Sequence, residues 1–289
     1  QNRNSDIVHT LIKINLKTSN STGSLTAKEY SVRTEILENL KTLEIKENIK
    51  ILYACESGSR AWGFPSADSD YDVRFVYVRN KDWYLRVDHE YCRDVVEKPI
   101  NDLLDISGWD LKKALKLLRK SNPALIEWFN SPIVYQQNDK FTEAFKELIP
   151  ILYSPRSCFY HYSHMASGNF REYLQGETVR IKKYFYVLRP ILAMQWIEQD
   201  RGVVPMEFEV LVNELVHDET LKSAIQKLLE DKRKGFESAY LPRIDVISDF
   251  ISSELERFKD KAQEQQKSET DFSKLNPFFI DVLNGEYGS

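Results

Sequence analysis

The stretch GSRAWGFPSADSDYDVRF (residues 58–75) follows one apolar run, IKILYAC (49–55), and leads into another, DVRFVYVRN (72–80). Both runs are rich in β-branched and aromatic residues, which predicts two buried strands. Asp70 and Asp72 stand one residue apart, so the alternation of a strand places their side chains on the same face. Two carboxylates that close repel each other unless a cation lies between them. The sequence therefore predicts a cation site at the edge of a sheet.

Magnesium suits such a pair, because Mg²⁺ prefers oxygen ligands and is commonly bound by one or two carboxylates together with substrate phosphates. A third carboxylate on a neighbouring strand would permit two ions, ~3.5–4 Å apart, as in phosphoryl transfer. Asp105 is the candidate, because a lone acid between apolar residues in a strand-like segment is costly to bury unpaired. Asp102 is a weaker candidate, and Asp110 is explained by capping of the helix that follows it.

Gly58 and Ser59 follow the first strand directly, and a turn of this kind presents backbone N–H groups and a hydroxyl to an anion. Arg60 adds a positive charge that serves either a phosphate or a neighbouring carboxylate. Each feature alone has an ordinary explanation, since SADSD (66–70) is good turn chemistry and a lone Asp-x-Asp is more often a solvated edge. The ordered set of strand, Gly-Ser, Asp-x-Asp, strand and isolated acid is what indicates a phosphate and metal site.

Composition excludes several classes of protein. The chain has 289 residues, 42% of them hydrophobic, and a net charge of -4, so no overall basic field attracts nucleic acid. Its three cysteines form no CxxC pair, which argues against a zinc ribbon or a disulfide framework and suits a reducing compartment. No apolar run approaches the ~20 residues that span a bilayer. The start, QNRNSDIVHT, lacks a signal pattern, and we expect a cytoplasmic protein without a membrane segment.

The pattern of apolar residues changes along the chain. Residues 1–28 are predicted to form a loosely ordered segment, and residues 29–137 a small mixed sheet flanked by helices. Helical periodicity dominates from there, so residues 138–289 are predicted to form an all-helical domain. The expected fold class is therefore α+β.

A basic segment of the second half, REYLQGETVRIKKYFYVLRP (171–190), stands out in an acidic protein. At 100° per residue Lys182, Tyr186 and Arg189 share one helix face, and Lys183 lies on an adjoining one. The functional interpretation is a clamp for a triphosphate or an acceptor that faces the acids. The structural interpretation is an amphipathic helix whose basic side chains extend to solvent while its apolar residues pack.

Four stretches carry a resemblance to a known family, namely LYACESGSRAWGF (52–64), SADSDYDVRFVYV (66–78), DISGWDLKKALKLLRKSNPALIEWFNSPIVY (105–135) and VRIKKYFYVLRPILA (179–193). Together they resemble the RNA-repair-associated branch of predicted nucleotidyltransferases in the DNA polymerase beta superfamily. The resemblance covers most of residues 50 to about 210, and it implies a minimal polymerase-beta-like palm with a sheet flanked by helices.

The resemblance also implies an activity. A nucleoside triphosphate is the expected donor, and Mg²⁺ (or Mn²⁺) is the expected cofactor. Family analogy suggests an RNA end as the acceptor, although a protein or a small molecule could chemically serve as the acceptor just as well. The serine turn of the superfamily falls on Gly58 and Ser59, and its catalytic metal-binding acids fall on Asp70, Asp72 and Asp105. The same resemblance favours a nucleotide-binding role for the remaining basic and aromatic candidates: Arg60, Lys182, Lys183, Tyr186 and Arg189.

Two other functions are compatible with parts of the pattern. A non-catalytic, nucleotide-binding regulatory protein would use the same cleft without turnover. A DxD glycosyltransferase is disfavoured, because its nucleotide-binding α/β half normally precedes the acids and the chain before Asp70 is too short for it.

Overall fold

The computed structural model describes residues 27–66, 68–99, 103–236, 240–263 and 271–287. The segment predicted over residues 1–28 lies almost wholly outside them, as does Asp102. The first part of the chain contains the elements α2 (Ala27–Glu47), β1 (Lys50–Glu56), α3 (Gly58–Ala61), β2 (Tyr71–Val78), α4 (Lys81–Tyr84), the 3₁₀-helix η1 (His89–Tyr91), β3 (Val95–Glu97), β4 (Leu104–Asp110), α5 (Leu111–Arg119), α6 (Pro123–Phe129), β5 (Val134–Gln137) and α7 (Asp139–Leu152).

The second part is mostly helical, as predicted. Its elements are α8 (Pro155–Tyr173), β6 (Thr178–Arg180), α9 (Ile181–Glu198), α10 (Phe208–Leu215), α11 (Glu219–Asp231), the π-helical turn η2 (Lys232–Phe236), β7 (Tyr240–Pro242), α12 (Asp245–Gln263) and α13 (Leu275–Leu283). Strands β6 and β7 pair antiparallel into a small sheet that the sequence pattern does not predict. Three residues are too few for strand alternation to be seen in a sequence.

Strands β1 to β5 form one mixed sheet in the order β3-β4-β2-β1-β5. Strands β2 and β4 run parallel, whereas the other neighbours in this sheet are antiparallel. The register of the parallel pair sets Asp72 directly beside Asp105. The topology of the sheet, more than the local sequence, therefore brings these two acids together.

The two faces of the sheet are covered by different helices, and strand β2 shows how. Val73, Phe75 and Tyr77 pack toward α2, which buries the apolar residues that its periodicity predicts: Val32, Ile36, Leu40 and Leu43. Val76 and Val78, on the other face, pack in a cluster with residues of α5, α6 and α7. This is the division of faces expected from side chains that alternate along a strand.

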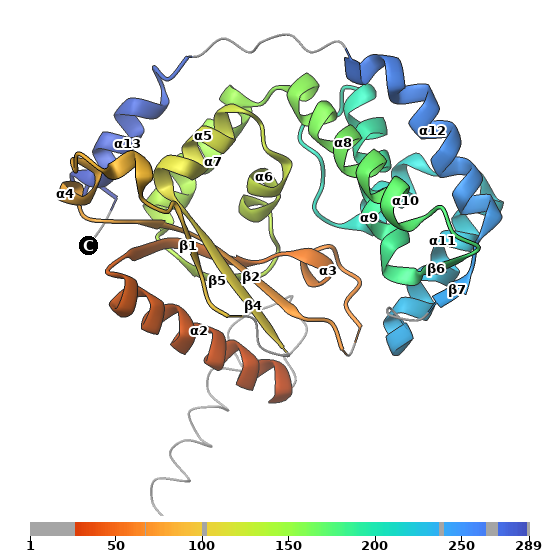
Figure 1. Ribbon diagram of the computed structural model, residues 1–289, viewed down its shortest axis with the longest axis horizontal. Coiled ribbons are helices and arrows are strands. Elements are labelled where there is room, and N and C mark those ends of the chain that lie inside the picture. The colour runs from red at the N-terminus through yellow and green to blue at the C-terminus, as the bar shows by residue number, and fades with distance from the viewer. Residues whose placement is uncertain (1–26, 67, 100–102, 237–239, 264–270, 288–289) are drawn as a thin grey trace, which may run out of the picture.

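The end of the chain returns to the sheet. Leu275, Phe278 and Val282 of α13 join the cluster of α5, α6 and α7, and Figure 1 shows α13 beside α5, far from α12, the helix that precedes it in the sequence. The mostly helical part packs around α9 as a separate cluster. Phe64, which follows α3, inserts into that cluster and stacks on Phe185 of α9 at 4.6 Å between ring centroids. The serine turn is therefore packed directly against α9.

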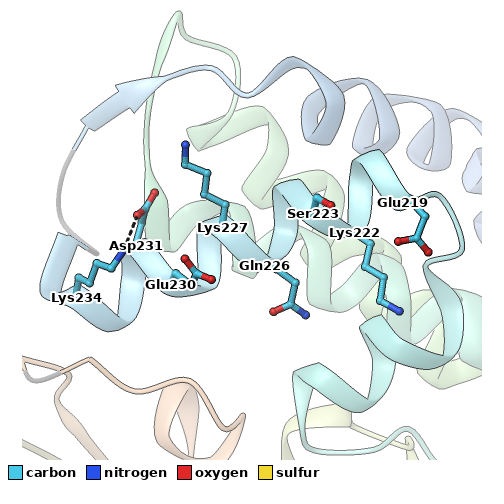
Figure 2. Close-up of a pocket in the computed structure, with 8 residues that line it drawn as sticks. All are labelled: Glu219, Lys222, Ser223, Gln226, Lys227, Glu230, Asp231 and Lys234. Carbon is cyan, nitrogen blue, oxygen red and sulfur yellow. Dashed lines mark ion pairs between the residues drawn. The ribbon is translucent and has the colours of Figure 1, made fainter.

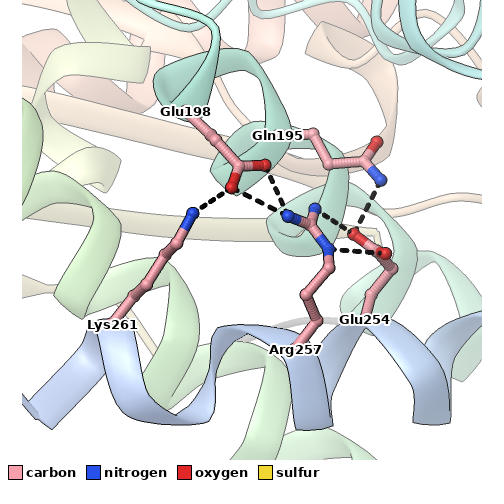
Figure 3. Close-up of polar contacts among 5 residues, drawn as sticks. All are labelled: Gln195, Glu198, Glu254, Arg257 and Lys261. Carbon is pink, nitrogen blue, oxygen red and sulfur yellow. Dashed lines mark hydrogen bonds and ion pairs between the residues drawn. The ribbon is translucent and has the colours of Figure 1, made fainter.

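Helix α12 is joined to α9 by a surface network of charges (Figure 3). Arg257 donates to both oxygens of Glu198, at 2.8 and 2.7 Å, and to Glu254 on its own helix. Lys261 also donates to Glu198, and Gln195 donates to Glu254 at 2.8 Å. Among the described helices none is both long and apolar enough to cross a membrane.

Candidate active site

A pocket of about 310 Å³ lies between the serine turn of the sheet and helix α9. The sheet side contributes the turn and two acids, and the helical side contributes basic and aromatic side chains. Its lining is made by Ser57, Gly58, Ser59, Trp62, Phe64, Asp70, Asp72, Arg74, Ala124, Glu127, Met165, Lys182, Phe185, Tyr186 and Lys232. Residues predicted from two distant stretches of sequence therefore share one pocket.

Gly58 lets the turn approach the acids. Its φ of +59° is in the left-handed region, which a residue with a side chain rarely adopts. A Cβ at this position would lie 2.1 Å from Asp72 Oδ2, so a larger residue would collide with the carboxylate. The neighbouring Ser57 N–H donates to the Asp72 carbonyl at 2.8 Å and fixes the turn to the start of β2.

The two acids of the Asp-x-Asp pair differ in environment. Asp70 is exposed at the pocket, whereas Asp72 is half-buried at the start of β2. Burial raises the pKa of the Asp72 carboxyl above its usual range, and the nearby Arg74 guanidinium lowers it in part. Asp72 is consequently the acid with the greater need of a cation.

Arg74 lies between Asp72 and Asp105. Its Nη2 donates to Asp72 Oδ1 at 3.1 Å and to Asp105 Oδ2 at 2.7 Å. Its Nη1 donates to the backbone carbonyls of Asp105 at 2.9 Å and of Val73 at 3.1 Å. The chain itself thus supplies a positive charge to this group of acids, which the sequence analysis did not foresee.

Glu56, at the end of β1, binds the backbone of Asp72 from the interior of the sheet. It is fully buried, and its Oε1 accepts a hydrogen bond from the Asp72 backbone N–H at 2.7 Å while its Oε2 accepts from the Tyr135 hydroxyl. Burial raises the pKa of this carboxyl to about 7. The signal in the sequence was an acid at the end of a buried strand, directly before Ser-Gly-Ser.

A family model described as the RNA repair pathway DNA polymerase beta family matches residues 32–281. The chain belongs to this family. The uncharacterized protein YcgL of Bacillus subtilis (strain 168) is 50% identical over 253 residues, which are 87% of this chain and 96% of that protein. The crystal structure of a nucleotidyltransferase-like protein from Exiguobacterium sibiricum 255-15 aligns with 87% of this chain and 89% of its own, at 10% identity and a TM-score of 0.35.

In this member of the polymerase beta family, Arg60 is turned toward the loop that carries Asp70. It donates to the carbonyls of Ser69 at 3.0 Å and Asp70 at 3.3 Å, and its guanidinium lies 3.6 Å from the centre of the Tyr71 ring. Ser59, which does line the pocket, donates from its hydroxyl to Ser69 Oγ at 3.2 Å. Arg60 thus contacts the loop and is absent from the pocket lining.

The basic helix α9 divides its predicted residues between two environments. Lys182 and Tyr186 line the pocket, as their shared helix face suggests. Lys183 instead lies over the Tyr173 ring at 3.5 Å, and burial lowers its pKa. Lys183 points to α8 because it is one residue, or about 100°, further around the helix than Lys182.

Arg189 shares a helix face with Lys182 but lies in the interior. Its Nη1 pairs with Glu127 Oε1 at 2.5 Å, and its Nη2 donates to the carbonyls of Pro205 and Met206. The same Glu127 accepts from the Tyr162 hydroxyl at 2.9 Å and from Trp62 Nε1 at 3.4 Å. Glu127 lines the pocket but Arg189 does not, so the structure places Arg189 behind the pocket wall, in the packing between α6 and α9, and not beside Asp70 and Asp72.

Lys232 is a pocket residue that the sequence analysis missed. It belongs to the π-helical turn η2, is only 3% exposed, and directs its Nζ to Ser69 Oγ at 3.4 Å. It lines the pocket, and its partner Ser69 lies on the same loop as Asp70. The sequence DKRKG (231–235) reads as a solvated helix end, and no local pattern distinguishes its first lysine from the next basic residues.

A wider hollow, of about 500 Å³, lies along the polar face of α11 and the turn after it (Figure 2). Its lining comes entirely from this one stretch, with acids and lysines mixed along it: Glu219, Lys222, Ser223, Gln226, Lys227, Glu230, Asp231 and Lys234. Figure 2 shows these side chains spread along the helix, with one ion pair between Asp231 and Lys234. Such mixed charges are typical of a solvated helix face, so the smaller pocket with the acids is the candidate site.

Two of the three predicted acids offer oxygen ligands to a divalent metal. Within the described residues, no three His, Cys, Asp or Glu side chains converge as a ready-made metal site, and Asp105 is held by Arg74. Asp70 and Asp72 nevertheless offer the hard oxygen atoms that Mg²⁺ prefers, and the missing side chain of Gly58 leaves room at Asp72 Oδ2. The pair therefore fits a metal whose other ligands are waters and substrate phosphates.

Proposed function

We propose that the chain is a divalent-metal-dependent nucleotidyltransferase that moves a nucleoside monophosphate from a nucleoside triphosphate to an acceptor. The observation that carries the proposal is the meeting of Gly58, Asp70 and Asp72 with Lys182 in one pocket of a polymerase beta family member. Acids of this kind, opposite basic side chains, suit a substrate that brings both phosphates and a metal.

The sheet side of the pocket holds the reacting end of the substrate. Asp70 and Asp72 are the residues that would hold Mg²⁺ or Mn²⁺, which when bound neutralises charge on the triphosphate. The turn at Gly58 and Ser59 receives the phosphates, because glycine permits close approach of the backbone. Glu56 keeps Asp72 in place through its bond to the Asp72 backbone N–H.

The helical side completes the nucleotide site. Lys182 and Lys232 supply positive charges from two separate elements, α9 and η2, and both line the pocket. Trp62 and Tyr186 meet edge to face at 6.3 Å between ring centroids and offer aromatic surfaces on which a base can stack. In this division of labour, the sheet and the helices that cover it act as the palm, and helices α8 to α12 form the helical partner on the other side of the nucleotide.

The chemistry is a substitution at the α-phosphorus. An oxygen of the acceptor attacks in line, the new P–O bond forms, the bond to the β-phosphate bridging oxygen breaks, and pyrophosphate leaves with that electron pair. The acceptor hydroxyl loses its proton to solvent. Catalysis of this type depends mainly on positioning and on neutralising charge, which is what acids with a metal and two opposing lysines provide.

We propose an RNA end as the acceptor, with the family name as support. An RNA end offers a hydroxyl nucleophile on a polyanion, and the overall charge of -4 means that contacts with it must be local to the pocket rim. We place the reaction in the cytoplasm, because the three cysteines are free thiols.

One observation favours a second candidate function. Arg74 already neutralises part of the charge of Asp72 and Asp105, so the pocket could bind a nucleotide without turning it over. Such a regulatory protein would bind nucleotide in the same pocket and release no pyrophosphate.

The test is transfer of label. Purified protein is incubated with each α-³²P-labelled nucleoside triphosphate, Mg²⁺ or Mn²⁺, and total RNA, and the label in RNA is counted. We expect incorporation by the wild-type chain and none by Asp72→Asn, which removes a ligand charge while keeping the shape of the side chain. Asp68→Asn is the matched control, because Asp68 is exposed, lies on the same loop and is outside the pocket lining.

The fold of each variant is checked by circular dichroism. Label in RNA with the wild type and Asp68→Asn alone establishes the transferase. Equal incorporation by Asp72→Asn would contradict the assignment of the site, and nucleotide binding without any incorporation would favour the regulatory function.

A further inference from the structure

Arg74 occupies a distinctive position in the proposed site. Asp72 and Asp105 are neighbours in the register of two parallel strands, and Arg74 stands two residues after Asp72, on the same face. Its Nη2 is shared between one oxygen of each acid, at 3.1 and 2.7 Å. A third acid beside an Asp-x-Asp pair is the arrangement that admits a second metal ion, and in this chain the guanidinium lies between the acids instead.

The guanidinium is held from more than one direction. Besides the two carboxylates, it donates to the carbonyl of Asp105 at 2.9 Å and to that of Val73 at 3.1 Å. The planar fork of arginine matches such a set of acceptors, and its limited side-chain exposure of 19% shows that it is not a freely moving surface group. Arg74 is therefore fixed between the acids by groups of the chain itself.

A guanidinium and a metal ion exclude each other from the same place. Arginine keeps its charge at every physiological pH and offers N–H donors but no lone pair, so it cannot serve as a ligand. Asp105 Oδ2 is bound to it, and so is Asp72 Oδ1. Asp72 Oδ2, by contrast, lies on the side of Gly58, and Asp70 is exposed at the pocket. The carboxylate oxygens on the pocket side suffice for one ion.

We propose that Arg74 is a fixed cation that takes the place of a second metal ion, so that the site binds one divalent ion through Asp70 and Asp72. Asp105 then serves to hold Arg74 and is not a metal ligand. This inference rests on the proposed function, since it concerns how many ions the nucleotidyltransferase site takes. It also revises the role that family resemblance gives to Asp105.

The experiment is a titration with Mn²⁺ alone, in which the electron paramagnetic resonance signal of the free ion reports how many ions each chain binds. We expect one ion for the wild type, none for Asp72→Asn, and one for Asp105→Asn with an affinity lowered by about 10–100-fold, the loss typical of residues that only support a ligand. Arg74→Met should bind a second ion, or bind the first at least about tenfold more tightly, because a neighbouring positive charge is gone.

Two further variants keep the inference testable if Arg74→Met does not fold. Arg74→Lys keeps the charge and should bind one ion like the wild type. The double variant Arg74→Met/Asp105→Asn removes one positive and one negative charge together, which avoids unpaired repulsion between the acids, and it should bind one ion more tightly than Asp105→Asn alone. Circular dichroism and thermal unfolding confirm the fold of each protein.

The outcomes separate the two claims. Two ions in the wild type, falling to one in Asp105→Asn, would overturn the inference and make Asp105 a metal ligand, while the proposed function would stand. Loss of the ion in Asp105→Asn as complete as in Asp72→Asn would overturn it too. Absence of Mn²⁺ binding in the wild type and in every Arg74 variant would contradict the metal dependence of the proposed function, and with it the inference.

Discussion

Arg74 and Arg189 both lie against carboxylates, but in opposite environments. Arg189 is 2% exposed and its partner Glu127 is 10% exposed, so this pair lies within the packing between α6 and α9. Arg74 is 19% exposed, and its partners Asp72 and Asp105 are about 30% exposed at the edge of a pocket. A buried pair fixes how elements pack, whereas a cation held beside acids at a pocket changes the charge that a ligand meets there. The same residue types therefore have a structural role in one place and a functional one in the other.

Breaking the buried pair gives the largest effect on stability. Arg189→Ala leaves Glu127 without its cation in the interior, and we expect the free energy of unfolding to fall by about 3–5 kcal/mol. Chemical denaturation followed by circular dichroism measures it. The double variant Arg189→Met/Glu127→Gln should lose much less, because no uncompensated charge remains; an equal loss would mean that the contact is governed by packing and not by charge.

Substitutions on the pocket side of α9 should lower nucleotide affinity and not stability. Lys182→Ala should weaken nucleotide binding about tenfold, the effect of a lost charged contact of about 1.4 kcal/mol, with little change in the melting temperature. Isothermal titration with a nucleoside triphosphate and Mg²⁺ measures the affinity. Lys183→Ala is the comparison variant and should weaken binding less, because Lys183 is absent from the pocket lining and its ammonium lies nearer to the Tyr173 ring, at 3.5 Å, than to the Tyr186 ring, at 5.0 Å. Equal losses in both variants would contradict the division of the helix into two faces.

Strand β4 carries a second acid, Asp110, which is held by hydrogen bonds from a hydroxyl and a backbone N–H. Asp110, at the far end from Asp105, accepts from the Tyr84 hydroxyl at 2.7 Å and from the Lys112 N–H at 2.8 Å. Burial raises its pKa, and these two hydrogen bonds lower it in part. A carboxyl with a raised pKa binds its proton more tightly in the folded chain, so its contribution to stability is complete below the unfolded pKa and is lost as the pH rises through the folded value.

Asp110→Asn should therefore flatten the fall of the unfolding free energy as the pH rises above the usual aspartate range. Asparagine also caps helices well, so the start of α5 is kept. Denaturation midpoints of wild type and variant across the acidic range measure the difference. A steeper pH dependence in the variant than in the wild type would contradict the sign.

The smallest effect is expected at the surface network of α12. Arg257 is 41% exposed, and exposed pairs contribute about 0.2–1 kcal/mol. Arg257→Ala should lower the free energy of unfolding within that range at low salt, and the difference should shrink toward zero in ~1 M salt. Lys259→Ala, which removes a pair within one exposed helix, should be closer to neutral. A loss that persists in high salt would mean that Arg257 contributes by packing.

Much of the fold could be predicted from the sequence, because its strands and helices carry strong local patterns. The periodic residues Val32, Ile36, Leu40 and Leu43 are buried as expected, and β2 alternates between two cores. The return of α13 to the sheet could not be foreseen, since an amphipathic helix does not say which surface it covers. The pairing of β6 with β7 joins segments far apart in the chain and depends on tertiary structure.

Site residues that lie close together in the sequence could be predicted, because their spacing fixes their geometry. Site residues whose position depends on contacts with distant parts of the chain could not. Gly58, Ser59, Asp70 and Asp72 line one pocket because one turn carries the first two, and the loop that ends at Asp70 leads directly into β2, which carries Asp72. Lys232 reaches the pocket from another element. Arg189 shares a helix face with Lys182 but is absent from the lining, because it pairs with the interior side of Glu127, which does line the pocket. The sequence shows Arg74 two residues after Asp72, but its contact with Asp105 depends on the register between β2 and β4, which the sequence does not show.

The most direct test of the account is the release of pyrophosphate. Wild-type protein, Asp72→Asn and Asp68→Asn are each given Mg²⁺, the four nucleoside triphosphates and RNA, and pyrophosphate is measured over time with a coupled assay. The account predicts steady release by the wild type and Asp68→Asn, in step with nucleotide added to RNA, and none by Asp72→Asn. Binding of nucleotide with no pyrophosphate from any of the three proteins would contradict it.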